Sequence, residues 1–299
     1  MKKYYMGIDG GNSKTQIVII DEALNVICDI TGKPSSIELM DLTTSVNIIN
    51  ETYHLNNLGL PITGVFAGIA GVIASDYEQE YERLFRKLPF IKDNASIVIK
   101  SDRYTSLLSK DATLEGIALI LGTSSSCFGF HNEVGFRVGG YPYQEGDAGS
   151  AYDLGNQALK YYARVLDKRI PESNFSNEIA NVLEINNITD LDNYFNHFNR
   201  VSVAKLAPIV TKFAPINQYA YHILATAADE VKMMVEAVYK TIGFDETSLV
   251  FSGGLIQAET MYRQLVFQNI KKVNSNIQIH TPLYSPAQGA AIFAQKNLK

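Results

Sequence analysis

The segment that most constrains the fold of this chain runs from Met6 to Thr15. A buried strand ends at an acidic residue, the chain turns through a glycine pair, and a second apolar strand follows. Glycines allow turn dihedrals closed to other residues and let backbone N–H groups approach a polyphosphate closely. The residues expected to bind a nucleotide are Asp9, Gly10, Gly11, Asn12, Ser13, Lys14 and Thr15, with Asp9 as a ligand for hydrated Mg2+. The alternative is an ordinary β-hairpin with a Gly-Gly turn.

This segment differs from two common phosphate-binding motifs. Ser13 precedes Lys14 where a P-loop has glycine, and a strand follows where a P-loop has a helix. The G-x-G-x-x-G spacing of dinucleotide-binding proteins is also missing. Elsewhere, the sequence has no G-x-S-x-G motif of serine hydrolases, and its five histidines lack metal-ligand spacing.

The arrangement of strand, glycine turn and strand recurs in the second half of the chain. Ile117 to Leu121 reads as a buried strand, and Gly122 to Ser126 as the turn that follows it. Near the C-terminus, Leu249 to Leu255 gives another apolar strand, which ends in the pair Gly253-Gly254 before a helical pattern.

These motifs, in this order, resemble the actin, Hsp70 and sugar-kinase superfamily of ATP-binding proteins. Gly139-Gly140-Tyr141 and the segment Gly146 to Tyr152 are similar to the G-G-W and G-D-E-G-S-A-Y motifs of N-acetylglucosamine kinases, which belong with the BadF/BadG/BcrA/BcrD-type ATPases. The resemblance spans nearly the whole chain. Its ordered motifs are Gly7 to Thr15, Ser101-Asp102, Gly122 to Cys127, Gly146 to Tyr152, Ser252 to Leu255 and Pro282 to Ala291.

The resemblance implies an α/β fold of two ribonuclease-H-like (actin-like ATPase) domains with a central ATP cleft. The N-terminal domain would comprise residues 1–112, joined by a C-terminal helix at 286–299, and the C-terminal domain would comprise residues 113–285. The ligands would be ATP and Mg2+, and the second glycine turn and the late glycine pair would also bind the nucleotide. These additional residues are Gly122, Thr123, Gly253 and Gly254.

Composition agrees with this architecture and narrows the possible partners. A chain of 299 residues with 46% hydrophobic content can bury two modest cores. A net charge of −5 offers no electrostatic footprint for nucleic acid or an anionic membrane, and no apolar run is long enough to span a bilayer. We therefore expect a cytoplasmic protein with a small-molecule substrate, and by analogy with related kinases a homodimer.

The two cysteines help to choose a subfamily. Cys28 and Cys127 are far apart in apolar strand contexts, which argues against a disulfide framework, a zinc site or an iron–sulfur cluster. Activators of acyl-CoA dehydratases share the fold that the resemblance implies, but they carry paired cluster cysteines that this chain lacks.

Hydrophobic periodicity predicts the elements around these motifs. Helices are expected from near Ile37 to Tyr53, over 77–88, from Asp147 to about Arg169, over 218–242 and from Pro286, with two or three more before Phe213. Strands are expected over 26–30, 64–69 and 97–100.

Asp102 is the candidate catalytic residue. It follows the strand over 97–100, and open α/β sheets bind ligands beyond the carboxyl ends of their strands, where an acid can accept the proton of an attacking hydroxyl. The alternative is that Asp102 only caps the helix that begins at Arg103. The resemblance supports catalysis, because the family's catalytic aspartate follows a strand in the same position.

The resemblance also suggests which residues contact the sugar. The aspartate of G-D-E-G-S contacts sugar hydroxyls in the sugar kinases, and the resemblance implies the same role for Asp147. The alternative is that Asp147 is an ordinary N-cap. The remaining predicted substrate-binding residues are Ser36, Asp102, Ser125 and Ser126.

Departures from the kinase pattern lie on the substrate side. Ser36 stands where these kinases tend to have the asparagine of P-S-N, and Gly122 to Ser126 lacks the asparagine of G-T-G-S-N. Ala70, Tyr141 and Ala148 replace the serine of L-S-G, the tryptophan of G-G-W and the glutamate of G-D-E-G-S. Smaller hydroxyl side chains are expected to widen the pocket around the sugar's substituents.

Three classes of function are compatible with these features. The first is an ATP-dependent amino-sugar kinase that phosphorylates N-acetylglucosamine, N-acetylmuramic acid or both, at the 6-hydroxyl by analogy with the family. An alternative within this class is a kinase for glucosamine or another sugar. The second class is a BadF-type ATPase acting on a protein partner. The third class is a weakly catalytic sensor that binds nucleotide and sugar.

Overall fold

The computed structural model describes residues 2–56, 59–73, 75–141, 147–197 and 199–298. The chain divides into two compact units, one formed by Met1–Glu115 with His280–Lys299 and the other by Gly116–Ile279. The elements of the first unit are β1 (Tyr4–Gly10), β2 (Thr15–Asp21), β3 (Val26–Gly32), α1 (Leu42–His54), β4 (Ile62–Ile69), α2 (Ser75–Phe85), β5 (Ile91–Lys100), α3 (Asp102–Leu108) and α12 (Pro286–Asn297).

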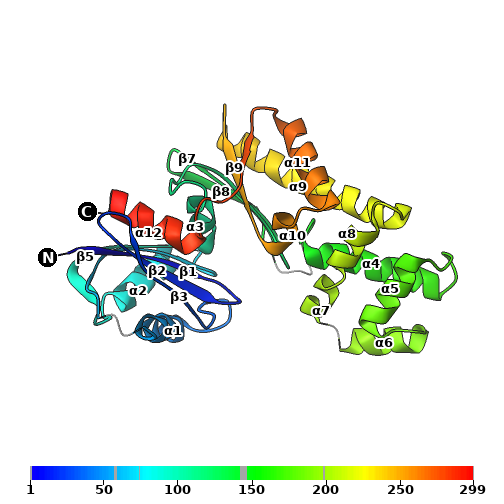
Figure 1. The fold of residues 1–299 in the computed structure, drawn as a ribbon, viewed down its shortest axis with the longest axis horizontal. Coiled ribbons are helices and arrows are strands. Elements are labelled where there is room, and N and C mark those ends of the chain that lie inside the picture. Colours follow the sequence, from blue (N-terminus) through cyan, green and yellow to red (C-terminus); the bar gives the residue numbers. More distant parts are fainter. Residues whose placement is uncertain (1, 57–58, 74, 142–146, 198, 299) are drawn as a thin grey trace. The chain divides into compact units, whose positions relative to one another are not determined.

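The first unit is a five-stranded sheet with helices on both faces (Figure 1). The strand order is β3-β2-β1-β4-β5, in which β1, β2 and β3 form an antiparallel meander and β1, β4 and β5 run parallel. Alternation along β2 sets the two faces. Ile17 and Ile19 pack in a core with α1 and α2, whereas Val18 and Ile20 pack in a second core with α12.

The second unit repeats this sheet and adds a group of helices. Its strand order, β10-β9-β6-β7-β8, again places an antiparallel meander beside a parallel pair, β6 and β9. Its elements are β6 (Gly116–Leu121), β7 (Ser125–His131), β8 (Val134–Gly139), α4 (Ala151–Leu166), α5 (Asn174–Leu183), α6 (Ile188–Asn196), α7 (Arg200–Ala204), α8 (Ala207–Phe213), α9 (Gln218–Ile242), β9 (Ser248–Ser252), α10 (Gly254–Gln257), α11 (Met261–Val273) and β10 (Gln278–His280).

The predicted fold class, two α/β domains built on related sheets, is confirmed. The long helix expected over 218–242 is α9 with these bounds, capped by Asn217 at its start and by Gly243 with a φ of 77° at its end. The C-terminal helix begins at Pro286 as expected, and α12 packs against β1, β2 and β4 of the first unit.

Several expected boundaries were wrong. The first helix begins at Leu42 because Asp41 caps it, and the preceding segment is instead held by the hydrogen bond from Ile37 N to the Ala70 carbonyl. Likewise α4 begins at Ala151 because Ser150 caps it, so the helix expected from Asp147 starts four residues later. Four helices, α5 to α8, lie between α4 and the end of α8 at Phe213, where two or three were expected. Strand β5 starts at Ile91, earlier than expected.

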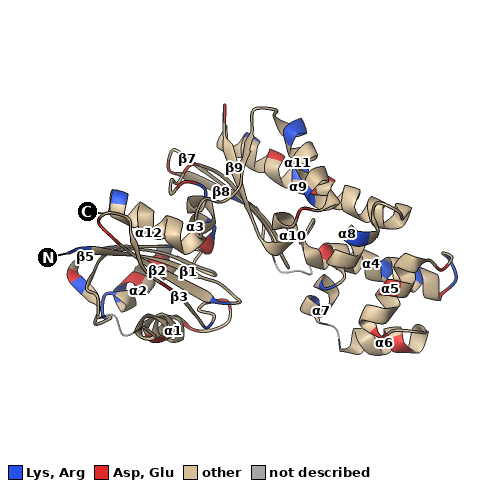
Figure 2. Cartoon of the chain, in the orientation of Figure 1, with Lys and Arg blue, Asp and Glu red and all other residues tan. Residues whose placement is uncertain are grey.

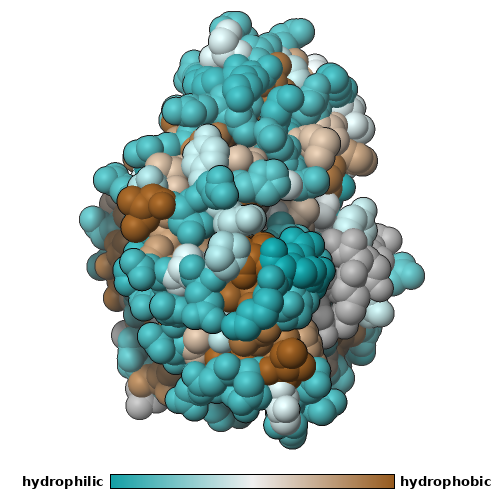
Figure 3. Space-filling model, turned by 90° about the vertical axis from the view of Figure 1, so that its right-hand side faces the viewer, coloured by the Kyte–Doolittle hydropathy of each residue, from teal (hydrophilic) through white to brown (hydrophobic). Residues whose placement is uncertain are grey.

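Figures 2 and 3 show where charged and apolar residues lie in the chain. Acidic and basic side chains are interspersed along both units in the view of Figure 2. The face shown in Figure 3 is mainly hydrophilic, with small separate apolar patches. None of the helices in the described ranges is long and apolar enough to cross a membrane.

The contact between β1 and α12 generates a test of the fold. A Cβ on Gly7 would overlap the backbone carbonyl of Ala287 and the backbone nitrogen of Ala291, so Gly7→Ala must push α12 off the sheet. We expect a loss of about 3 kcal/mol or more in the free energy of unfolding, measured by urea denaturation. Gly254→Ala is the control, because its Cβ meets no atom within 4 Å. Equal stabilities of the two variants would contradict the packing described.

Candidate functional site

The functional residues of the first unit lie at one edge of its sheet. Strands β1, β4 and β5 are parallel, so the loops that follow Gly10, Ile69 and Lys100 share the edge at their carboxyl ends. The loop after β3 meets the same edge, where the Ser36 hydroxyl and the Ile37 N–H both donate to the Ala70 carbonyl. Ala70 N–H in turn donates to the Gly10 carbonyl at 2.8 Å. The polar residues of three loops are thereby drawn together.

Thr105 links the two predicted acidic residues. Its hydroxyl lies 2.6 Å from Asp9 Oδ1 and 2.7 Å from the backbone carbonyl oxygen of Asp102. Gly68 permits this arrangement, because a Cβ there would overlap the Thr105 side chain and lie 3.1 Å from Asp102 Cα. The sequence analysis did not include Thr105, although its position one helical turn after Asp102 placed it on the same face of α3.

The alternative that Asp102 only caps a helix is wrong. Ser101 is the N-cap of α3, since its side chain accepts from the Arg103 backbone N–H, and Asp102 is the first helical residue. The Asp102 carboxylate accepts a hydrogen bond of 3.0 Å from the Ser101 hydroxyl. It is therefore held at the sheet edge with one oxygen engaged by a neutral donor.

Both carboxyl groups have raised pKa values. Burial raises the pKa of Asp9 to about 7; the Thr105 hydrogen bond and the charge of Lys14 oppose this rise, and the charge of Asp102 adds to it. Burial also raises the pKa of Asp102, against the hydrogen bond from Ser101 and the charge of Arg103, and the charge of Glu38 adds to the rise. Loss of water around the two carboxyl groups is thus the main cause of both shifts, and neighbouring acids add to it.

Asp9 has the chemistry of a Mg2+ ligand. Mg2+ prefers oxygen ligands and is commonly held by one or two carboxylates together with waters and phosphates. A half-buried carboxylate with a pKa of about 7 has too little stabilisation of its negative charge, and a divalent cation would supply more. Within the described ranges, no three His, Cys, Asp or Glu side chains are grouped so as to hold a metal ion by themselves. The remaining ligands would come from nucleotide and water.

The first glycine turn departs from the expected geometry. Neither Gly10 nor Gly11 has a φ in the left-handed region, so special dihedrals are not the reason for these glycines. At Gly10 the reason is space, since a Cβ would overlap the Ser35 hydroxyl and lie 2.7 Å from Ile69 Cδ1. The Gly11 N–H is used within the turn, where it donates to the Lys14 carbonyl at 3.0 Å.

The side chains of this turn divide into exposed and buried groups. Asn12, Ser13 and Lys14 are exposed, and the Asn12 amide donates to Glu38 at 2.8 Å. The Thr15 hydroxyl is buried and lies 2.7 Å from both the Lys33 carbonyl and the Ser35 hydroxyl. Ser36 is also fully buried. In this structure the Thr15 and Ser36 hydroxyls hold the loop after β3.

The second glycine turn lies at the equivalent edge of the second sheet. Parallel β6 and β9 bring Gly122 and Gly253 together, and a Cβ on Gly122 would lie 3.9 Å from Gly253 Cα. Gly253 has a φ of 96°, which a side chain would strain. The Gly122 carbonyl accepts from the Ala151 N–H at 2.8 Å, which ties the turn to the start of α4. Thr123 and Gly254 are exposed.

Asp147 is nearly fully buried and is not an N-cap. Its Oδ1 accepts from the Ser125 backbone N–H at 3.1 Å, and its Oδ2 forms an ion pair with Arg200 of α7. The Ser125 hydroxyl donates to the Ala148 carbonyl at 2.7 Å, and Ser126 is half-buried beside it on β7. Gly146 of the same motif lies outside the described residues. Arg200 was missed because 53 residues of sequence separate it from Asp147.

A cavity of about 410 Å³ opens beside these glycines within the second unit. It brings together three predicted nucleotide-binding residues, Gly122, Thr123 and Gly254. The sequence analysis missed the rest of its wall, which includes Val201, Ala204, Lys205, Pro208, Thr211 and Thr260. A largely apolar cavity with a few polar groups is typical of a small-molecule site.

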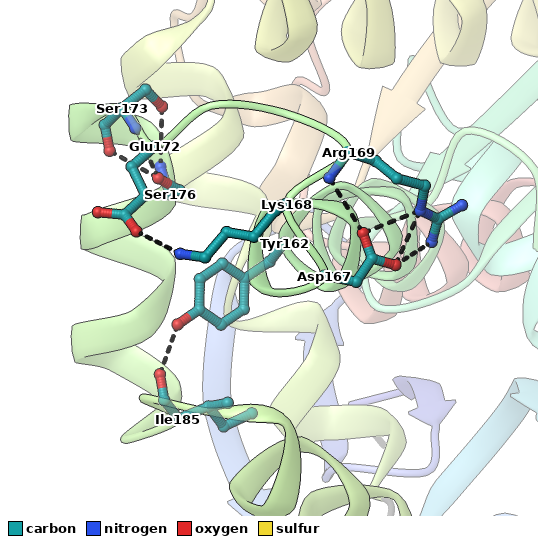
Figure 4. Close-up of polar contacts among 8 residues, drawn as sticks. All are labelled: Tyr162, Asp167, Lys168, Arg169, Glu172, Ser173, Ser176 and Ile185. Atoms are coloured by element: carbon teal, nitrogen blue, oxygen red, sulfur yellow. Dashed lines mark hydrogen bonds and ion pairs between the residues drawn. The ribbon is translucent and has the colours of Figure 1, made fainter.

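A second cavity, of about 600 Å³, lies among α4, α5 and α6 (Figure 4). The Tyr162 hydroxyl on its wall donates to the Ile185 carbonyl at 2.6 Å, and Lys168 pairs with Glu172 at 3.1 Å. Ser176 takes part in the capping box of α5 with Ser173. These polar groups hold the helices together, and none of the predicted site residues lies on this wall.

Comparison with known proteins identifies the family. A model of the BadF/BadG/BcrA/BcrD ATPase family matches residues 6–294. The chain belongs to this family. The predicted membership is therefore confirmed.

Two relatives of the chain are named as amino-sugar kinases. The N-acetylmuramic acid/N-acetylglucosamine kinase of Clostridium acetobutylicum is 27% identical, with 98% of each chain covered. The N-acetyl-D-glucosamine kinase of Dictyostelium discoideum is 25% identical over 100% of this chain and 99% of its own. Among solved structures, a candidate N-acetylglucosamine kinase from Chromobacterium violaceum has a TM-score of 0.77 at 22% identity, covering 98% of this chain and 99% of its own. That last similarity shows the shared fold.

The raised pKa of Asp9 predicts a pH-dependent stability. In the folded protein Asp9 keeps its proton up to about pH 7, whereas the unfolded chain releases it near the ordinary aspartate pKa of 3.8. Raising the pH between these values therefore destabilises the wild type, by about 2 kcal/mol from pH 5 to pH 8 relative to Asp9→Asn. Urea denaturation at several pH values measures the difference. Parallel pH profiles would contradict the described environment, and excess Mg2+ at pH 8 should stabilise the wild type more than the variant.

Proposed function

We propose that this protein is an ATP-dependent kinase of amino sugars. The acceptor would be N-acetylglucosamine, N-acetylmuramic acid or both, phosphorylated at the 6-hydroxyl. The observation that carries the proposal is the link between two aspartates at neighbouring strand ends. The Thr105 hydroxyl contacts the Asp9 carboxylate, after β1, and the backbone carbonyl of Asp102, after β5. The names of the two relatives, which align over almost the entire chain, support the same activity.

Asp102 would act on the acceptor hydroxyl. A raised pKa makes its carboxylate a stronger base, and its position at a strand end suits a group that accepts the hydroxyl proton. As the sugar oxygen bonds to the γ-phosphorus, the bond to the β–γ bridging oxygen breaks and ADP leaves. The transition state of phosphoryl transfer is loose, so orientation of the hydroxyl contributes much of the effect.

Asp9 would hold the cation, and Asp147 the sugar. When bound, Mg2+ would neutralise charge on the phosphates. Asp147 is already paired with Arg200 and bonded to the Ser125 N–H, so its carboxylate is fixed in place. A fixed carboxylate that accepts hydrogen bonds from sugar hydroxyls rejects ligands that lack them. The cavity beside Gly122 and Gly254 would receive the nucleoside.

Substitution of Asp102 tests the catalytic role. We expect Asp102→Asn to lower sugar-dependent ADP release by about 10²- to 10⁴-fold, because the amide cannot accept the proton, while ADP still binds. A coupled assay measures ADP release, and calorimetry measures ADP affinity. Asp93→Asn, an exposed residue of β5, is the matched control and should retain activity. Activity of Asp102→Asn within tenfold of wild type would overturn the role.

Substitution of Asp147 tests the sugar site separately. Asn can still accept from the Ser125 N–H but removes the charge that faces Arg200. We expect Asp147→Asn to raise KM for the sugar about 10- to 100-fold with little change in KM for ATP, because sugar hydroxyls would bind to a weaker acceptor. An equal rise in both constants would indicate a general loss of structure.

The choice of acceptor distinguishes the alternative functions. Turnover is compared for N-acetylglucosamine, N-acetylmuramic acid and free glucosamine with excess ATP, and 31P NMR locates the phosphate on the product. ATP hydrolysis without any sugar would favour an ATPase that acts on a protein partner. Failure with all three sugars would refute the amino-sugar assignment.

A further inference from the structure

The nucleotide cavity of the second unit allows an inference about the phosphoryl donor, which rests on the proposed kinase function. We propose that this cavity does not discriminate strongly among nucleobases, so that ATP, GTP, CTP and UTP all serve as donors. The argument depends on the chemistry of the groups that line the cavity.

The wall beyond the glycine turn is mainly apolar. Val201, Ala204 and Pro208 lie on one side, and Leu255 and Ala258 come from the segment after Gly254. Such side chains contact the flat face of any base by dispersion and by removing it from water, and neither effect distinguishes an amino from a keto group. None of the described residues that line the cavity is Asp, Glu, Asn or Gln, the side chains with fixed hydrogen-bonding patterns best suited to reading a base edge.

The hydroxyl groups of the cavity are adaptable or already engaged. Thr211 donates to the Pro208 carbonyl at 2.8 Å, and Thr260 accepts from the Arg263 N–H as the N-cap of α11. A hydroxyl has one rotatable hydrogen and two lone pairs, so Thr260 can donate to a keto group or a ring nitrogen. These groups pair with every base.

The charged group of the cavity is equally permissive. Lys205 is exposed and lies on a flexible four-carbon stem. Its ammonium is only a donor, and each of the four bases presents at least one acceptor on its edge. A lysine here strengthens nucleotide binding without choosing the base.

Strong rejection of an analogue requires a buried polar group that the analogue leaves unpaired, which can be worth 10⁴- to 10⁵-fold. The cavity wall offers no such side chain among its described residues. By contrast, the predicted phosphate contacts at Gly122, Thr123 and Gly254 involve a triphosphate that all four nucleotides share. We therefore expect kcat/KM values for the four donors to agree within about tenfold.

The test compares the four nucleoside triphosphates at a saturating concentration of the accepted sugar. Release of each nucleoside diphosphate is measured, and kcat/KM is determined for each donor. Values within about tenfold of ATP support the inference. A larger preference for any one donor or pair of donors overturns it. A preference for ATP and CTP over GTP and UTP would indicate that a backbone carbonyl of the wall reads the amino group.

Direct binding separates this inference from the proposed function. Calorimetry with ADP, GDP, CDP and UDP requires no acceptor, so similar affinities would sustain the inference even if no sugar were phosphorylated. Tight binding of ADP alone would refute it while leaving the kinase proposal intact. Thr211→Val removes a hydroxyl at nearly constant volume and should change all four affinities by the same factor. A loss confined to one diphosphate would show that Thr211 reads that base and would overturn the proposal.

Discussion

The candidate catalytic site of the first unit depends on the close approach of α3 to the sheet at Gly68. A side chain at this position would occupy the space of Thr105 and press against Asp102. Without that approach, the Thr105 hydroxyl would not reach Asp9, and the bond that ties the Asp9 carboxylate to the first turn of α3 would be lost. The contact between Gly7 and α12 supports the same strands from one face of the sheet.

Glycines also permit close packing around the site residues of the second unit. Gly149 has a φ of 76°, and a Cβ there would overlap Val231 of α9. Only glycine at this position therefore lets the segment between Asp147 and α4 pack closely against α9. Gly155 similarly allows α4 to touch the backbone of Val203 in α7. Because Arg200 and the cavity residues Val201 and Ala204 lie on α7, this packing positions both the ion pair with Asp147 and one wall of the cavity.

Features that depend on neighbouring residues could be predicted from the sequence, and features that depend on distant residues could not. The strands and glycine turns were predictable because apolar runs and glycine pairs are contiguous, and α9 was predictable because its caps adjoin a long periodic segment. The predicted start of α1 was wrong because the apolar spacing extends N-terminal to the Asp41 cap, into the preceding loop. Thr105 and Arg200 were missed because the carboxylates they contact, Asp9 and Asp147, are distant from them in the sequence. The wall formed by α7 and α8 has no motif at all, since alanine, valine and proline carry no chemical signature in a sequence.

The site aspartates of the two units have different electrostatic surroundings. In the first unit, burial and neighbouring carboxylates raise the pKa values of Asp9 and Asp102, so both groups gain from a proton or a cation. In the second unit, Asp147 already has Arg200 and a backbone N–H, which satisfies its charge and restricts its motion. A carboxylate short of positive charge is suited to accept a proton or bind a metal ion. Asp147 is held by a cation and a backbone N–H, so its geometry is set before any ligand arrives.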